Sequence, residues 1–274
     1  MIRVLSGTVL AAVFFAVVWF SNATVLLAVA IAVCALALHE FAALMHALEV
    51  DVPLLPTLIA TVAVLVTVPF PYVPLEVVLG IGVLLIASAT MVQASRMAED
   101  VAVDGQGFRP ATRAAAAAAL SMVYLGLPLG TLVGIHIYGG RSAVLLLVAA
   151  IAVSDTAQYY AGRLLGRRPL APRLSPKKTI EGAVGGFVAA PVFLYLVGPQ
   201  LIPVAQPLMV GLLGVGLVTA GIAGDLFESM LKRASGAKDS SSLIPGHGGV
   251  LDRIDALLFA APMFYLYVRW VYTI

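Results

Sequence analysis

Residues 205–233 read AQPLMVGLLGVGLVTAGIAGDLFESMLKR, an apolar run that turns polar at Asp225. The apolar part is long enough to cross a bilayer, because a transmembrane helix needs about 20 such residues. On a helix, four polar side chains of this stretch lie at i, i+3, i+4 and i+7 and share one face: Asp225, Glu228, Ser229 and Lys232. Ionised groups inside a membrane span are costly and therefore indicate a functional site. The stretch predicts a transmembrane helix with a polar site at one end.

The composition extends this interpretation to the whole chain. A mean hydropathy of +1.04 and a hydrophobic share of 61% are typical of integral membrane proteins. We therefore predict an all-α, polytopic integral membrane protein in which residues 1–274 form a single membrane-embedded domain. About nine transmembrane helices are expected, at residues 4–20, 24–45, 53–71, 74–93, 112–135, 143–161, 180–198, 205–228 and 250–270. The first is similar to a signal peptide, but its apolar core is longer than usual and another span follows at once.

Nine spans place the N-terminus and four loops on one face of the membrane. These loops cover residues 46–52, 94–111, 162–179 and 229–249. Fourteen of the sixteen Lys and Arg residues lie nearest to this face, and the positive-inside rule then makes it the cytoplasmic face. We therefore expect a cytoplasmic N-terminus and a C-terminus on the opposite side.

The polar residues divide the chain into two parts. Residues 1–140 are interpreted mainly as scaffold, because their first four spans contain few polar residues apart from His39 and Glu40. Residues 141–274 carry three polar clusters that reach the same face, at 154–160, 175–182 and 225–255. Glycines spaced for close helix contacts accompany them, namely Gly182, Gly185, Gly186, Gly221 and Gly224. We expect these glycines to serve helix packing.

Three classes of site are excluded by the sequence. Cys34 is the only cysteine and lies within a predicted span, so one chain can form neither a disulfide framework nor a cysteine metal site. The basic residues form no recognition helix and no stacking platform, so we expect no binding of nucleic acid. No Gly-x-x-x-x-Gly-Lys-Ser/Thr sequence occurs, and the chain is therefore not a P-loop enzyme.

The acidic residues predict a site for magnesium. Hard carboxylates without neighbouring Cys or paired His favour Mg²⁺ over Zn²⁺ or copper. Asp225 and Asp252 are best placed as ligands, since each lies at the inner end of a span. Asp255 shares a helix face with Asp252, and Asp155 lies deeper, in span 143–161. The alternative is structural: Asp225 and Asp252 could form ion pairs, and Asp155 could pair with Arg163 or with a tyrosine.

The basic residues near these acids predict phosphate binding. Six of them could neutralise a triphosphate: Arg163, Lys177, Lys178, Lys232, Lys238 and Arg253. Glycines at 246, 248 and 249 would let backbone N–H groups approach the phosphates. Thr179 is a candidate N-cap for the next helix, whose N-terminus would favour anions. The alternative for the arginines at 163–173 is that they bind anionic lipid heads. Glu181 could only stabilise the first turn of its helix, and His247 could only hydrogen-bond the glycine loop.

A long pattern in the last third of the chain points to a family. Its positions are Ser229, Lys232-Arg233, Lys238-Asp239, Pro245, His247-Gly248-Gly249, Asp252-Arg253 and Asp255. Together with the element SPKKTIEG at 175–182, this pattern resembles the signature of the phosphatidate cytidylyltransferases, also called CDP-diacylglycerol synthases. The resemblance covers roughly residues 150–270. Two positions depart from it: Ala157-Gln158 replaces the usual Gly-Ala after Asp155-Thr156, and Ala256 replaces a common Ser.

The resemblance implies an activity and a set of site residues. The chain would transfer the cytidylyl group of CTP to phosphatidate, giving CDP-diacylglycerol and pyrophosphate for phospholipid biosynthesis. Mg²⁺, with a second cation as an option, would be held by Asp225 and Asp252, with Asp155 and Asp255 as further ligands. Catalytic roles fall to Asp225, Asp252, Lys177, Lys238 and Asp239. Substrate binding falls to Ser175, Lys178, Thr179, Arg163, Lys232, His247, Gly248, Gly249 and Arg253. The expected partners are CTP, phosphatidate, the lipid bilayer and a second copy in a homodimer, in a bacterial-type inner (plasma) membrane.

Two other functions remain open at this point. A CTP-dependent lipid kinase would use a similar metal and nucleotide, but it would transfer the γ-phosphoryl group to a hydroxyl and would need a base. A transporter would use intramembrane carboxylates as cation sites, yet such sites tend to lie near the bilayer midplane. The acids of this chain gather at one face instead, which favours the cytidylyl transferase.

Overall fold

The structure, a computed structural model, describes residues 2–20, 22–97, 108–244, 246 and 248–273. It is 81% helical, which confirms the predicted all-α class. The elements in chain order are α1 (Ile2–Phe20), α2 (Ala23–His46), α3 (Leu54–Thr67), α4 (Leu75–Met97), α5 (Arg109–Ser121), the π-helical turn η3 (Met122–Gly126), α6 (Leu127–Leu165), β1 (Pro169–Ala171), β2 (Ser175–Thr179), α7 (Ile180–Leu201), α8 (Pro207–Ala234) and α9 (Leu251–Thr273).

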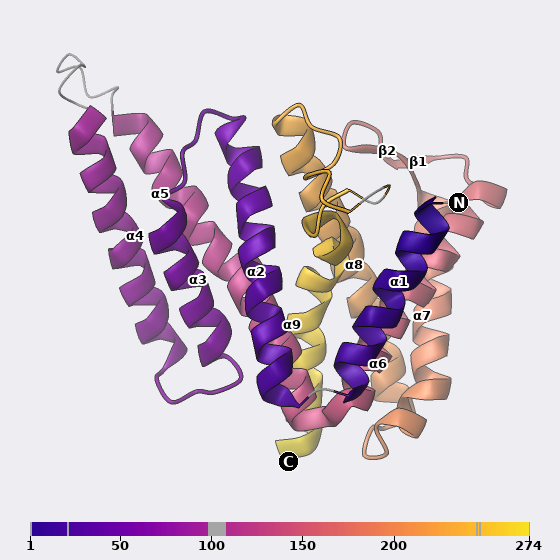
Figure 1. Ribbon diagram of the computed structural model, residues 1–274. Helices are drawn as coiled ribbons and strands as arrows, with labels where there is room; N and C mark the ends of the chain where they lie inside the picture. The colour runs from indigo at the N-terminus through magenta and orange to yellow at the C-terminus, as the bar shows by residue number, and fades with distance from the viewer. Residues whose placement is uncertain (1, 21, 98–107, 245, 247, 274) are drawn as a thin grey trace.

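Six helical segments of the described chain are long and apolar enough to cross a membrane, so the protein is a polytopic membrane protein. The expected count of nine is not confirmed. The six do not include α1, nor α3, which has only 14 residues. Two expected spans, 112–135 and 143–161, fall within one continuous helical stretch of 57 residues, Arg109–Leu165. That stretch is bent at Gly140, whose φ of 72° and ψ of −176° are not helical, and its two arms run in opposite directions (Figure 1).

The connections between helices sort to the two ends of the bundle. The start of α1, the α2–α3 loop, the β-hairpin and the loop between α8 and α9 lie at the upper end in Figure 1. The α3–α4 loop, the α7–α8 loop and the end of α9 lie at the lower end. This arrangement agrees with the predicted alternation of loops between two faces. It brings the polar clusters 154–160, 175–182 and 225–255 to the same end.

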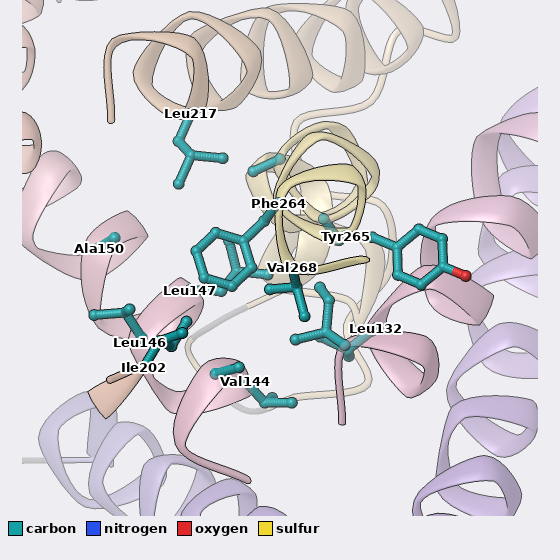
Figure 2. Packing of buried hydrophobic residues seen from close by; sticks show 14 of the residues in the cluster. Leu132, Val144, Leu146, Leu147, Ala150, Ile202, Leu217, Phe264, Tyr265 and Val268 are labelled. Atoms are coloured by element: carbon teal, nitrogen blue, oxygen red, sulfur yellow. The ribbon is translucent and has the colours of Figure 1, made fainter. Parts of the chain in front are cut away.

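The core of the second half is built from α6, α8 and α9. Phe264 of α9 is fully buried, as are Leu146 and Leu147 of α6. Figure 2 shows Phe264 between Leu217 of α8 and these α6 leucines. Lipid is as apolar as these side chains, so close van der Waals packing stabilises this core more than expulsion of water does. The packed core fixes the helix ends that carry the polar residues.

The glycines of the second half allow the close approach of helices, as predicted. A Cβ atom on Gly185 of α7 would lie 2.6 Å from the Ala161 Cβ and 3.0 Å from the Ala157 carbonyl of α6. A Cβ atom on Gly224 of α8 would lie 2.4 Å from the backbone carbonyl of Asp255 in α9. Any larger residue at these positions would push the helices apart. The acids on α8 and α9 can therefore come into contact.

A short antiparallel hairpin was not expected from the sequence. Strand β1 pairs with β2, with Pro169 opposite Thr179 and Ala171 opposite Ser175. Its second strand leads directly into α7, because the Thr179 hydroxyl accepts a hydrogen bond from the Gly182 N–H at 3.1 Å. The predicted N-cap is thus confirmed. The hairpin carries Lys177 and Lys178 across the polar end of the bundle.

Candidate functional site

A cavity of about 350 Å³ opens at the polar end of the bundle. Small-molecule sites commonly have volumes of roughly 300–1,000 Å³. The cavity lies between the end of α6, the β-hairpin, the start of α7 and α8. Its lining residues are Asp155, Gln158, Tyr159, Gly162, Arg163, Leu170, Lys177, Lys178, Thr179, Gly182, Ala183 and Asp225. Six predicted site residues are thus brought together although they come from three separate parts of the sequence: Arg163 and Asp155, Lys177 to Thr179, and Asp225.

Three acids, which we call the pocket carboxylates, lie at or beside this cavity: Asp155 and Asp225 line it, and Asp255 of α9 contacts Asp225. Asp225 forms an ion pair with Lys178, which lies on β2. The carboxyl groups of Asp225 and Asp255 are in contact, because Gly224 lets α8 approach the backbone of α9. Two carboxylates in contact repel each other unless a positive charge or a proton lies beside them. Lys178 supplies such a charge on one side.

The wall of the cavity formed by α6 is polar as well. Gln158 donates a hydrogen bond from Nε2 to the Ser154 hydroxyl at 2.9 Å and approaches the Asp155 carboxylate at 3.5 Å. Arg163 donates to the Tyr159 hydroxyl at 3.3 Å, one turn earlier on the same helix. The alternative predicted for Asp155, in which it pairs with Arg163 or with a tyrosine, stays a prediction. The charge of Arg163 faces the cavity, where an anion could bind.

A second acidic group, which we call the Lys232 cluster, lies between α8 and α9. The Lys232 ammonium contacts Glu228 at 2.5 Å and Asp252 at 2.6 Å. The carboxylate side chains of Glu228 and Asp252 are only 2% and 5% exposed, and the Lys232 side chain between them is 13% exposed. Glu228 and Lys232 of the predicted polar stripe of α8 share a face, where they form an ion pair and Lys232 meets the acid at the start of α9. Among the described residues, the Glu228 Oε1 atom has no hydrogen-bond partner.

Asp252 has more partners than Lys232 alone. Its Oδ2 atom accepts hydrogen bonds from the Ser240 N–H at 2.8 Å, the Ser240 hydroxyl at 2.7 Å and the Gly249 N–H at 2.8 Å. Asp252 therefore holds the loop between α8 and α9 on the helix ends. Its predicted role as a cation ligand stays a prediction, and a cation at Oδ1 would have to displace the Lys232 ammonium. The N–H of Gly249 is likewise directed at Asp252 and not at open solvent.

The remaining predicted residues lie outside the lining of the cavity. Lys238, Asp239 and Arg253 are exposed on the α8–α9 loop and at the start of α9. Ser175 pairs with Ala171 in the hairpin. Gly248 has a φ of +80°, and a Cβ atom there would lie 2.7 Å from the Asp252 carboxylate, so the turn itself requires glycine. His247 lies outside the described residues, and its predicted role stays a prediction.

The acids of the cavity fit a magnesium ion held jointly with a substrate. Among the residues that the structure describes, no group of three or more His, Cys, Asp or Glu side chains is arranged to hold a metal ion. Magnesium, however, commonly takes only one or two carboxylates and completes its shell with water and substrate phosphates. The contacting pair Asp225 and Asp255 matches this requirement. Asp155 on the cavity wall adds negative charge nearby.

Two elements of the site were missed by the sequence analysis. Gln158 was noted only as a departure from a pattern, and the structure places it in the cavity wall. Glu40 of α2 is 3% exposed and contacts the α8–α9 loop. A signal for Glu40 was present in the sequence, because a lone acid in an apolar span indicates a partner within the protein. The partner itself, some 200 positions away, could not be identified from spacing.

The chain is similar to known proteins over most of its length. A family model described as the cytidylyltransferase family matches residues 1–271. A phosphatidate cytidylyltransferase of Haemophilus influenzae is 43% identical over 135 residues, which are 46% of each chain. A protein of the same name from Pseudomonas aeruginosa is 49% identical over 123 residues, 44% of each chain. An uncharacterized protein of Escherichia coli is 44% identical over 137 residues, 49% of this chain and 45% of the other. The matched segments thus span about half the length of these curated relatives. The family model covers nearly the whole chain, and the chain therefore belongs to the cytidylyltransferase family.

Proposed function

We propose that this protein transfers the cytidylyl group of CTP to phosphatidate and releases pyrophosphate. The observation that carries the proposal is the cavity at the polar end of a membrane bundle, which is lined by the basic residues Lys177, Lys178 and Arg163 and by the acids Asp155 and Asp225. This combination suits a site for a metal-bound nucleotide triphosphate. Family membership and the names of relatives from Haemophilus influenzae and Pseudomonas aeruginosa support the same reaction.

The chemistry requires positioning more than acid–base catalysis. Phosphatidate is a phosphate monoester whose second pKa is near 6, so it is largely a dianion at neutral pH. One of its oxygens can attack the α-phosphorus of CTP directly, forming a new P–O bond while the bond to the β-phosphate oxygen breaks. The pyrophosphate leaves with the electron pair of that bond. No proton has to be removed from the nucleophile, and no general base is needed.

The residues of the cavity have distinct proposed tasks. Lys177, Lys178 and Arg163 would bind phosphate oxygens and stabilise the charge on the leaving pyrophosphate. Asp225, with Asp255 and Asp155, would hold Mg²⁺, which when bound neutralises the phosphates and orients them for in-line attack. The Thr179 cap at the start of α7 directs the positive end of that helix toward the same cavity. Lys238, Asp239, Arg253 and His247 would complete the site from the α8–α9 loop.

The proposed placement in the membrane explains how two unlike substrates meet. We propose that the polar end, with the N-terminus, faces the cytoplasm of a bacterial-type inner membrane, which is the side indicated by the Lys and Arg residues. CTP would then arrive from water and phosphatidate sideways from the bilayer. The two arms of Arg109–Leu165, together with α1 and α3, would give nine crossings. Association as a homodimer is proposed on the family resemblance alone.

The test is a product assay on detergent-purified protein with phosphatidate, Mg²⁺, and CTP labelled at either the α or the γ position. Label from the α position in the lipid fraction, with γ-label released as pyrophosphate, is expected. Addition of EDTA should stop the reaction and excess Mg²⁺ should restore it. The proposal would be wrong if γ-label entered an added polyprenol or diacylglycerol and phosphatidate received nothing. That result would identify a lipid kinase.

A further inference from the structure

Glu40 is a buried acid of the scaffold part whose hydrogen-bond partners, within the part of the chain that the structure describes, belong to the α8–α9 loop and the start of α9. Its Oε1 atom accepts hydrogen bonds from the Ser241 hydroxyl at 2.6 Å and the Val250 N–H at 2.9 Å. Its Oε2 atom lies 3.0 Å from the Ser240 hydroxyl and accepts from the Leu251 N–H at 2.8 Å. The residue is 3% exposed. A single carboxylate of α2 thus contacts four residues that lie about 200 positions later in the chain.

These partners flank the segment 242–249 on both sides. Ser240 and Ser241 precede it, and Val250 and Leu251 follow it. The N–H groups of Val250 and Leu251 are at the start of α9, where backbone donors have no partner within the helix. A carboxylate there satisfies them and interacts favourably with the helix dipole. Glu40 therefore fixes the start of α9 and closes the loop at its base.

Asp252 contacts the same base of the loop from the other side, through Ser240 and Gly249. The Ser240 hydroxyl lies between the two carboxylates, 3.0 Å from Glu40 and 2.7 Å from Asp252, and can donate to either. Gly249 packs directly against them, since a Cβ atom there would lie 2.1 Å from the Ser240 Oγ and 2.5 Å from both Glu40 oxygens. The base of the loop is therefore closely packed at Gly249. Lys238, Asp239 and Gly248 are held on the closed segment or beside it.

We propose that Glu40 is a positioning residue that fixes the 240–251 segment so that the α8–α9 loop can present its polar groups to the nucleotide phosphates. The attachment of the loop to Glu40 follows from the four contacts, and only the identity of the loop's ligand rests on the proposed function. The scaffold part of the chain thereby contributes to the site through α2, although α2 does not line the cavity. The effect of losing Glu40 should be specific to the nucleotide and should not extend to the lipid.

The test compares wild type with Glu40→Gln, which keeps the size of the side chain but turns an NH₂ group toward donors. Hydrogen exchange is measured at the amides of 240–252, and KM is measured separately for CTP and for phosphatidate. Charged hydrogen bonds of this kind typically account for factors of ten or more. We expect exchange at Val250 and Leu251 to rise at least about tenfold, the KM for CTP to rise about tenfold, and the KM for phosphatidate to change less than about twofold.

Two further variants keep the result interpretable. Thr61→Val alters another buried polar residue of the scaffold, whose hydroxyl lies 3.1 Å from that of Ser121, and should leave both exchange in 240–252 and the two KM values unchanged. Ser241→Ala removes one partner of Glu40 and should raise amide exchange in 240–252 and the KM for CTP by smaller factors. This variant carries the test if Glu40→Gln does not fold. Unchanged exchange in both Glu40→Gln and Ser241→Ala, or an equal change in both KM values, would overturn the proposal. If wild type transferred no cytidylyl group, the proposed function would fall, while the exchange measurement would still decide whether Glu40 holds the loop.

Discussion

Asp225 and Asp252 occupy matching places in the sequence, each at the polar end of a membrane helix, but their surroundings differ. The Asp225 side chain is 22% exposed, lines the cavity and pairs with Lys178. The Asp252 side chain is 5% exposed and accepts from Lys232, from Gly249 and twice from Ser240. We therefore expect that Asp225 can exchange its ammonium partner for a cation or a substrate without disturbing the helix packing. Asp252 cannot change partners without releasing the loop.

The same contrast separates two groups of acids, namely the pocket carboxylates on one side and the Lys232 cluster together with Glu40 on the other. The pocket carboxylates concentrate negative charge beside open space, where a bound cation would relieve their repulsion. The Lys232 cluster and Glu40 place carboxylates on backbone N–H groups, hydroxyls and an ammonium inside the protein. Buried acids of this second kind are stabilised by hydrogen bonds and ion pairs, although the Glu228 Oε1 atom has no partner among the described residues. In the proposed function the pocket carboxylates serve the chemistry, whereas the Lys232 cluster and Glu40 hold the helices and the α8–α9 loop in place.

The strongest test of this difference between the two groups of acids, and the variant with the largest expected effect, is Asp225→Asn. The amide keeps the size of the side chain but cannot supply the charge that a cation requires, so turnover should fall by about 1,000-fold, or about 4 kcal/mol in the activation free energy. Thermal unfolding in detergent should change little, because the Asp225 side chain faces the cavity. Asp51→Asn serves as the control. Asp51 is an exposed acid outside the lining of the cavity, and its Oδ1 atom lies 2.6 Å from the Nδ1 atom of His46. Wild-type turnover in Asp225→Asn would remove this residue from the proposed metal site.

Asp252→Asn should mainly lower the stability of the protein, whereas Asp225→Asn should mainly lower its turnover. The substitution removes the charge that faces the buried Lys232 ammonium, and breaking a buried pair costs about 3–5 kcal/mol. Because Glu228 remains as a partner for Lys232, we expect a loss near the lower end, about 3 kcal/mol, measured as a lower denaturant or thermal midpoint in detergent. Unchanged stability together with complete loss of turnover would instead assign Asp252 to the metal, as its place in the signature predicts.

The sequence predicted local features of this structure well and long-range ones poorly. The face shared by Glu228 and Lys232, the Thr179 cap and the close contacts of Gly185 and Gly224 all follow from helix geometry over a few residues. The predicted number of nine membrane crossings is not confirmed, because α3 has only 14 residues and because two expected spans fall in one helical stretch, whose two arms meet at the bend at Gly140.

The division of roles between the acids was also beyond the sequence. Asp252 and Asp255 are three residues apart on one helix, and spacing treats them alike. Their partners are set by the depth at which α8 crosses α9, so Asp255 meets Asp225 while Asp252 meets Lys232. Glu40 was visible as a lone acid in an apolar span, but its partners lie in a loop whose path depends on tertiary packing. The β-hairpin was missed because strands of three and five residues leave almost no periodic signal.

The smallest expected effect concerns Gln158, where the chain departs from the pattern that it resembles. Gln158 lines the cavity and reaches Asp155 through a long contact of 3.5 Å, and Gly186 makes room for it, since a Cβ atom there would lie 2.8 Å from the Gln158 Cγ. Neutral hydrogen bonds contribute about 1 kcal/mol, so Gln158→Ala should change kcat/KM about fivefold and leave stability within about 1 kcal/mol. Steady-state kinetics with CTP and phosphatidate varied in turn would show which substrate is affected. A change larger than that of Asp225→Asn would contradict the view that the pocket carboxylates dominate this site, and it would make the α6 wall the main determinant of activity.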